Sequence, residues 1–172
     1  MSLRVALSCA AAALALAGCG SDPKPGACPR AGILSDAANL VRFSGTGRGP
    51  EDVLYRGEIT NVALDCSPHS DVVKGELTLT VRLALGPRAT MRAETVRYFV
   101  AVTEGDARVL AKESFELPVS FTAGEAVATA SDTVENVRIP LAPGRRGGAY
   151  EIVVGFELSP DEVAFNRAHQ GS

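Results

Sequence analysis

Residues 76–85 read Glu-Leu-Thr-Leu-Thr-Val-Arg-Leu-Ala-Leu, and their pattern is the clearest indication of the fold. Leucine or valine stands at every second position, and the residues between them are charged, hydroxyl-bearing or small. A period of two places alternate side chains on opposite faces of an extended strand, so that one face enters a core and the other meets water. The stretch therefore predicts an amphipathic β-strand.

Similar alternation recurs on both sides of this strand. It predicts further strands at residues 52–65, 96–102, 107–115, 115–121, 137–141 and 150–158. Glycine and proline punctuate the intervals, for example at 143–148, as expected of turns. Pro118 requires an edge strand or a bulge, because proline donates no hydrogen bond to a neighbouring strand. We therefore expect an all-β fold, an antiparallel β-sandwich of immunoglobulin-like type with six or seven strands.

Two short helices are expected at the ends of this β body. Residues 33–43 allow a helix capped by Ser35, with apolar residues gathered on one face. Near the C-terminus, Ser159 is a suitable cap, Pro160 suits the first helical position and Glu162 completes a capping box. We expect a second helix over residues 160–169, with a packing role.

The start of the chain has the features of an export signal. Arg4 provides a positive start, and residues 5–15 form an apolar run that is too short to span a bilayer. The following Leu16-Ala17-Gly18-Cys19 resembles the lipobox of bacterial lipoproteins, in which the cysteine receives a diacylglyceryl group. This resemblance implies cleavage after residue 18 and a palmitate-type acyl anchor at Cys19. An ordinary signal-peptidase site at residues 15–17 is the alternative, and it would release a soluble protein.

The anchor implies a location. Two or three acyl chains hold a protein stably on a membrane, whereas a single chain binds only marginally. Gly20 after the cysteine, rather than aspartate, resembles the signal for transport to the outer membrane. We therefore expect a cell-envelope protein, lipid-anchored to the outer membrane and facing the periplasm.

The mature chain then divides into a tether and one domain. Residues 19–27 are polar and contain two prolines, which predicts an extended tether about 25 Å long. Residues 28–172 suit a single domain. Cys28 and Cys66 are the two cysteines that remain beyond the anchor, and in an oxidising periplasm they predict one disulfide. A redox or metal pair is disfavoured because the chain has no C-x-x-C spacing.

The amino-acid composition disfavours some classes of binding partner. The chain has 17 basic and 20 acidic residues and no tryptophan, so it lacks both a basic footprint for nucleic acid and material for a stacking platform. Arg145 and Arg146 lie in a glycine-rich turn, where two guanidinium groups could grip a phosphate or carboxylate of a partner. We expect a partner contact there, although a solvated turn explains the same residues.

The chemical inventory indicates no active site. His69 and His169 are the only histidines, and no G-x-S-x-G elbow or phosphate loop is present. The loop at 66–71 carries sulfur, nitrogen and oxygen groups but does not complete a metal site. The glycine-rich stretch at 45–49 fits a loop. We expect no cofactor, no metal and no enzymatic activity, with an unrecognised hydrolase as the remaining exception.

A set of short segments carries a resemblance over nearly the whole mature chain. They are residues 28–29, 56–59 leading to Cys66, 98–102, 109–112 and 158–167. Together they resemble a family of uncharacterised alphaproteobacterial envelope lipoproteins. The resemblance implies a location and supplies no mechanism. The expected function is therefore a non-enzymatic structural or protein-interaction module, and the alternative is a periplasmic carrier of a small or lipidic ligand.

Overall fold

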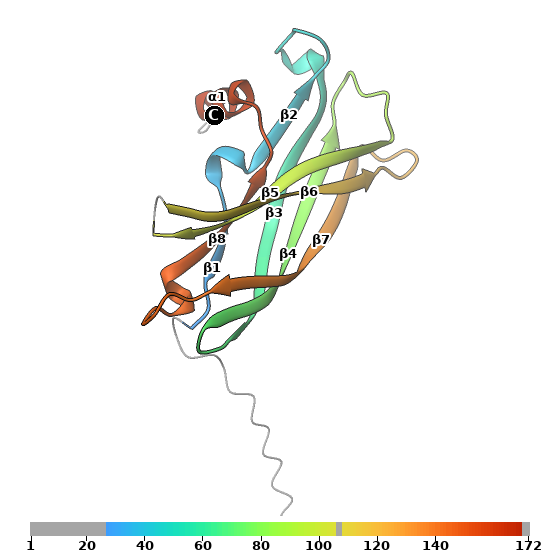
Figure 1. The fold of residues 1–172 in the computed structure, drawn as a ribbon. Coiled ribbons are helices and arrows are strands. Elements are labelled where there is room, and N and C mark those ends of the chain that lie inside the picture. Colours follow the sequence, from blue (N-terminus) through green and yellow to red (C-terminus); the bar gives the residue numbers. More distant parts are fainter. Residues whose placement is uncertain (1–26, 106–107, 170–172) are drawn as a thin grey trace, which may run out of the picture.

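The computed structural model describes residues 27–105 and 108–169, which form two packed four-stranded sheets (Figure 1). The strand order is β1-β8-β5-β6 in the first sheet and β2-β3-β4-β7 in the second. Neighbouring strands are antiparallel except for β1 and β8, which run parallel. The expected all-β sandwich is confirmed. The strands are β1 (Arg30–Ile33), β2 (Asn39–Phe43), β3 (Val53–Pro68), β4 (Val72–Leu85), β5 (Ala93–Glu104), β6 (Arg108–Ser120), β7 (Val127–Pro140) and β8 (Tyr150–Phe156).

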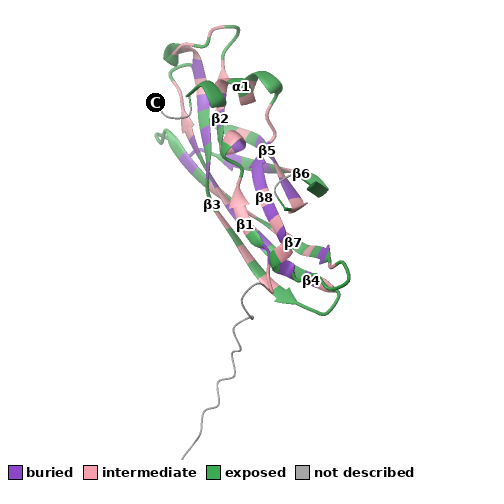
Figure 2. Cartoon of the chain, turned by 90° about the vertical axis from the view of Figure 1, so that its left-hand side faces the viewer, coloured by how far each residue is buried: buried purple, intermediate pink, exposed green. Residues whose placement is uncertain are grey.

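The core lies between the two sheets, and the alternating residues fill it. In β4 the side chains of Leu77, Leu79, Val81 and Leu83 are all 0% exposed. Buried residues of β5 and β8 face them from the other sheet, including Tyr98, Ile152, Val154 and Phe156. Figure 2 shows the buried positions along the central strands and the exposed ones in the loops. Each such aliphatic side chain contributes about 1.5–3 kcal/mol by leaving water.

The helix expected at residues 33–43 is wrong. This segment contains the end of β1, a single 3-10 turn, η1 (Ser35–Ala37), and then β2. β1 pairs with β8 and β2 pairs with β3, so the chain changes sheet within a few residues. The spacing of apolar residues there fits a helix equally well, but pairing with two open strand edges decides the structure.

The number of strands is eight rather than six or seven. The sequence pattern missed β1, β2 and most of β7, and it divided the single strand β6 into two, at 107–115 and 115–121. The predicted strand at 137–141 is the end of β7, which begins at residue 127. Ala128, Ala130 and Asp132 occupy its inward positions, and small or polar residues leave little hydrophobic signal. Asn136 has a φ of 58°, and the register with β4 shifts beside it, which interrupts the alternation.

The C-terminal helix α1 (Pro160–His169) is confirmed, together with its capping box. The Ser159 N–H donates to Glu162 Oε2 at 2.8 Å, and the Glu162 N–H donates to Ser159 Oγ at 3.3 Å. Two further 3-10 turns, η2 (Pro50–Asp52) and η3 (Gly147–Ala149), lie in the connections before β3 and β8.

The outer strands of the two sheets meet on one side of the sandwich. β6 ends the first sheet and β7 ends the second, and the two strands are in contact. In Figure 1, β5 and β6 run across the direction of β3 and β4. The expected edge position of Pro118 is confirmed, because Pro118 lies in β6 and pairs with Thr95 of β5 on one side only.

Candidate functional site

The predicted disulfide is present, and it joins the two sheets. Cys28, just before β1, is bonded to Cys66 in β3, with a sequence separation of 38. Cys28 and Cys66 therefore have a structural role as a cross-link. The predicted lipidation site, Cys19, and the signal segment 1–18 lie outside the described residues.

The two arginines predicted to contact a partner are exposed in the loop between β7 and β8. Arg145 Nε lies 3.5 Å from Glu104 Oε1, so its charge is paired with a residue of β5. The backbone carbonyl of Arg146 accepts a hydrogen bond from the Ala149 N–H, which closes η3. The structure does not bring the two guanidinium groups together around a cavity, and the partner contact at Arg145 and Arg146 stays a prediction.

The two histidines lie apart and form no chemical cluster. His69 is exposed in the turn between β3 and β4, and its backbone N–H donates to the carbonyl of Val72. The ring of His169 stacks on Phe165 at 4.1 Å, at the end of α1. Within residues 27–105 and 108–169, no group of three or more histidine, cysteine, aspartate or glutamate side chains could hold a metal ion.

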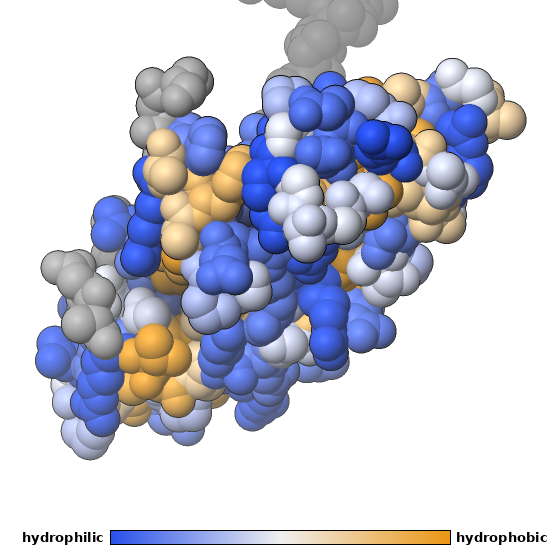
Figure 3. Space-filling view, turned by 90° about the horizontal axis from the view of Figure 1, so that it is seen from above, coloured by the Kyte–Doolittle hydropathy of each residue, from blue (hydrophilic) through white to orange (hydrophobic). Residues whose placement is uncertain are grey.

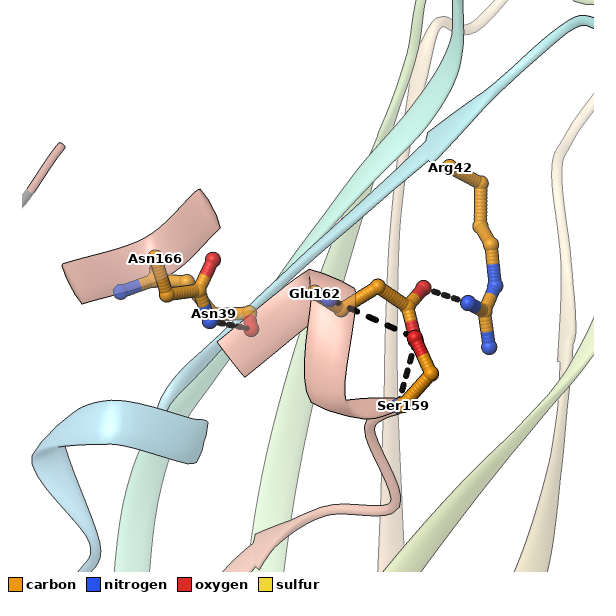
Figure 4. A network of polar contacts seen from close by, with 5 residues as sticks. All are labelled: Asn39, Arg42, Ser159, Glu162 and Asn166. Atoms are coloured by element: carbon orange, nitrogen blue, oxygen red, sulfur yellow. Dashed lines mark hydrogen bonds and ion pairs between the residues drawn. The ribbon is translucent and has the colours of Figure 1, made fainter. Parts of the chain in front are cut away.

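A cleft of about 580 Å³ lies between α1, β2 and the loop that follows β2. Several of its charged side chains are engaged within the chain. Arg42 forms an ion pair with Glu162 (Figure 4). Arg48 donates to the carbonyls of Gly45 and Gly47. Seen from this end, most of the surface is hydrophilic and the hydrophobic areas are small and separate (Figure 3).

A buried asparagine of α1 holds this helix against the body of the domain, beside the cleft. Asn166 of α1 is 9% exposed, and its Nδ2 donates to the backbone carbonyls of Asp36 and Asn39 at 3.1 and 2.8 Å. Phe165 packs edge-on against Phe43 of β2, with ring centroids 5.4 Å apart. These contacts fasten α1 to the body, so the cleft is a helix-docking seam whose polar groups satisfy one another.

A second hollow has a different character and lies where β6 and β7 meet. We call it the edge groove. It measures about 220 Å³ and opens between the two outer strands. Its lining combines apolar and polar residues, namely Val100, Val102, Ala111, Phe115, Val134 and Val137 together with Lys112, Glu113, Glu135, Asn136 and Arg138.

The first half of β6 borders this groove and is exposed along its length. Residues 108–114 are all exposed, including two large apolar side chains, Val109 at 59% and Leu110 at 42%. Within the described part of the chain, no strand pairs with the outer edge of β6. An unpaired edge presents a row of backbone N–H and C=O groups that can template another strand.

One backbone hydrogen bond shows which residues of β6 present these groups. The Glu157 N–H donates to the carbonyl of Arg97 at 2.9 Å, so the backbone of Arg97 is turned away from β6. Its partner across the β5–β6 ladder is Glu116, whose N–H and C=O therefore point outward. By the same alternation, the backbone N–H and C=O groups of Lys112 and Ser114 also point outward. The backbone of Pro118 points outward too, which suits an edge strand because its nitrogen has no hydrogen to donate.

The solvent face of this edge carries a charge network. Lys112 Nζ lies 3.0 Å from Glu157 Oε1 and 4.4 Å from the centre of the Phe99 ring. Ser114 Oγ donates to the same carboxylate at 2.7 Å. These hydrogen bonds from Ser114 and Lys112 lower the pKa of Glu157 below its usual range. Beside them, Arg97 Nε lies 3.3 Å from Glu116 Oε1.

The inner side of the same region is closed by a tyrosine. The ring of Tyr98 is fully buried and stacks on Phe115 at 5.3 Å. Its hydroxyl donates to Asp132 Oδ2 of β7 at 2.8 Å, which links the two sheets. Burial and the hydrogen bond to Asp132 raise the pKa of Tyr98 well above its usual range, so the phenol remains a donor. The edge groove therefore ends on a packed interior.

The exposed edge was only partly foreseeable from the sequence. Pro118 indicated an edge strand or a bulge, but nothing in the alternation of β6 distinguishes an uncovered edge from a covered one.

Comparison of the chain with family models, curated proteins and solved structures gave no match. Among the residues with a described structure, no helix is long and apolar enough to cross a membrane.

Proposed function

We propose that this chain is a non-enzymatic, lipid-anchored protein of the cell envelope that acts as an interaction module. The anchor is the acylated Cys19, and the tether of residues 19–27 lets the sandwich stand off the lipid surface. The binding surface is the outer edge of β6, which takes up an extended strand of a protein partner by β-strand addition.

The observation that carries this proposal is the exposure of β6. Residues 108–114 are exposed, and Val109 and Leu110 present apolar surface to solvent. Proteins generally cover, shorten or protect such edges, because an open one recruits other strands. A long open edge beside a partly apolar groove is therefore best explained by a partner that pairs with it.

The state of the interior supports an interaction module over a ligand carrier. A carrier needs a cavity that encloses its ligand. Here the space between the sheets is filled by side chains that are fully buried, such as Leu79, Tyr98 and Phe156. The hollows of the described chain are open surface clefts, and the edge groove has only about 220 Å³.

Crosslinking in intact cells tests the proposal, with two variants that differ only at the edge. Ser114→Pro removes an outward-pointing N–H without touching the β5–β6 ladder, whereas Ser114→Ala keeps it. Both variants lose the hydroxyl contact to Glu157. Any difference between them therefore reports the loss of the backbone N–H at residue 114. We expect the native protein and Ser114→Ala to crosslink to a protein partner. The crosslink should be lost in Ser114→Pro.

Equal crosslinking of the two variants would contradict the proposed surface. Circular dichroism of each purified variant confirms that the fold is kept. A separate fractionation of Cys19→Ser tests the anchor, because this variant should leave the membrane fraction.

A further inference from the structure

We propose that the strand that pairs with β6 is β6 of a second copy of this chain. The two strands run antiparallel, with a two-fold axis at Ser114, and they join two four-stranded sheets into one. This inference rests on the proposed function and specifies the partner of the same edge.

The regular part of β6 has its midpoint at Ser114. Toward the N-terminus the ladder with β5 is interrupted, because Val102 pairs with Ala111 while the next residue, Thr103, pairs with Val109. Toward the C-terminus Pro118 has no N–H to donate. The uninterrupted stretch is therefore 111–117, and a symmetric antiparallel pairing uses all of it only when it is centred on Ser114.

The backbone groups fit this register. Lys112, Ser114 and Glu116 point their N–H and C=O groups away from β5, as the Arg97 carbonyl bond establishes. Centred on Ser114, the pairing opposes Ser114 to its own copy and Lys112 to Glu116 of the second copy, twice. Each opposed pair exchanges two hydrogen bonds, which makes about six in all.

Charge complementarity selects the same register. The side chains of Lys112 and Glu116 lie on the solvent face, and the two-fold axis at Ser114 places each beside its opposite charge. A centre at Lys112, Glu113 or Glu116 would instead set that charge against its own copy, and directly opposed like charges destabilise a strand pair. Across the junction the charges alternate in sign from Arg97 to Glu116 and on to Lys112 of the second copy.

The ends of the paired stretch are also matched. Leu110, which is 42% exposed, comes opposite Pro118 of the second copy. Both residues are exposed in the single chain, and the hydrogen-bonded pairing ends here because Pro118 has no N–H to donate. The pairing therefore covers an apolar side chain that is otherwise in water.

Disulfide trapping in intact cells tests the register directly. Residues directly opposed in a hydrogen-bonded pair have Cα atoms about 5.5 Å apart, which lies within the range for a disulfide. Ser114→Cys should therefore give a dimer on a non-reducing gel. Ser120→Cys is the matched control, because its two copies would lie about 40 Å apart along the strands.

A charge exchange tests the contact without a cross-link. Lys112→Glu should weaken self-association on the order of tenfold, because symmetry repeats the like-charge contact twice. The double variant Lys112→Glu and Glu116→Lys should restore it. Within one copy the exchange sets like charges beside Glu157 and Arg97, so recovery must come from the second copy. Lys74→Glu, on the other sheet, makes the same charge change and should have no effect.

The outcomes separate this inference from the proposed function. A Ser114→Cys dimer with rescue by the double variant supports the inference. No dimer at Ser114, or equal dimers at Ser114 and Ser120, overturns it. If Ser114→Pro still loses a different crosslinked protein, the proposed interaction edge stands and only the identity of the partner is wrong.

Discussion

Removal of the Cys28–Cys66 disulfide should lower the stability of the domain by a predictable amount. The bond closes a loop with a sequence separation of 38 and ties the start of β1 to the end of β3. In the chain-entropy model, a loop of this length restricts the unfolded chain by about 4 kcal/mol. For a domain of this size, that corresponds to a fall of roughly 8–16 °C in Tm.

The assay is thermal unfolding followed by circular dichroism in the Cys19→Ser background, which keeps the anchor cysteine out of the measurement. The variant carrying Cys28→Ala and Cys66→Ala is compared with its parent, with and without a thiol reductant. Reductant should lower the Tm of the parent to that of the variant and leave the variant unchanged. A Tm difference below about 2 °C would refute the reasoning, because the bond would then not restrict the unfolded chain.

Three further predictions concern single residues. Tyr98→Phe should lower the free energy of unfolding by about 1–2 kcal/mol in urea titration, because Asp132 loses a buried donor; an unchanged midpoint would mean that water replaces the hydroxyl. The folded-state pKa of Glu157 is lowered, so its contribution to stability is present at neutral pH and is lost as the pH falls through that pKa. Glu157→Gln should therefore be less stable than the parent at pH 7, and the difference should vanish in acid; a constant difference would contradict the assignment. Cys19→Ser should move the protein from washed membranes to the soluble fraction, and persistence in the membranes would exclude the lipobox.

Strong period-two alternation made most of the sandwich predictable. The strands β3, β4, β5 and β8 have large apolar residues at every second position, and the helix α1 has an explicit capping box. Residues 33–43 were predicted as a helix, and residues 127–136 were not assigned to a strand. Their inward positions are few, small or polar, so pairing with neighbouring strands determines their structure, and pairing partners are not visible in a single sequence.

The candidate site was less predictable than the fold. The disulfide followed from the count of cysteines in an expected oxidising compartment. The edge of β6 was indicated by Pro118 alone, because exposure of a strand depends on which elements the rest of the chain leaves beside it. Arg145 looked free in the sequence, but Glu104, which is distant in the chain, pairs with it.

Hydrogen–deuterium exchange at single-residue resolution tests the central claim most directly, namely that the outer edge of β6 is paired in the envelope. The protein in native membranes is compared with the dilute Cys19→Ser chain. We expect the outward amides of Lys112, Ser114 and Glu116 to exchange rapidly in the dilute chain and to be protected in the membranes, because strand pairing shields these amides from water. Equally rapid exchange of these three amides in both samples would contradict it.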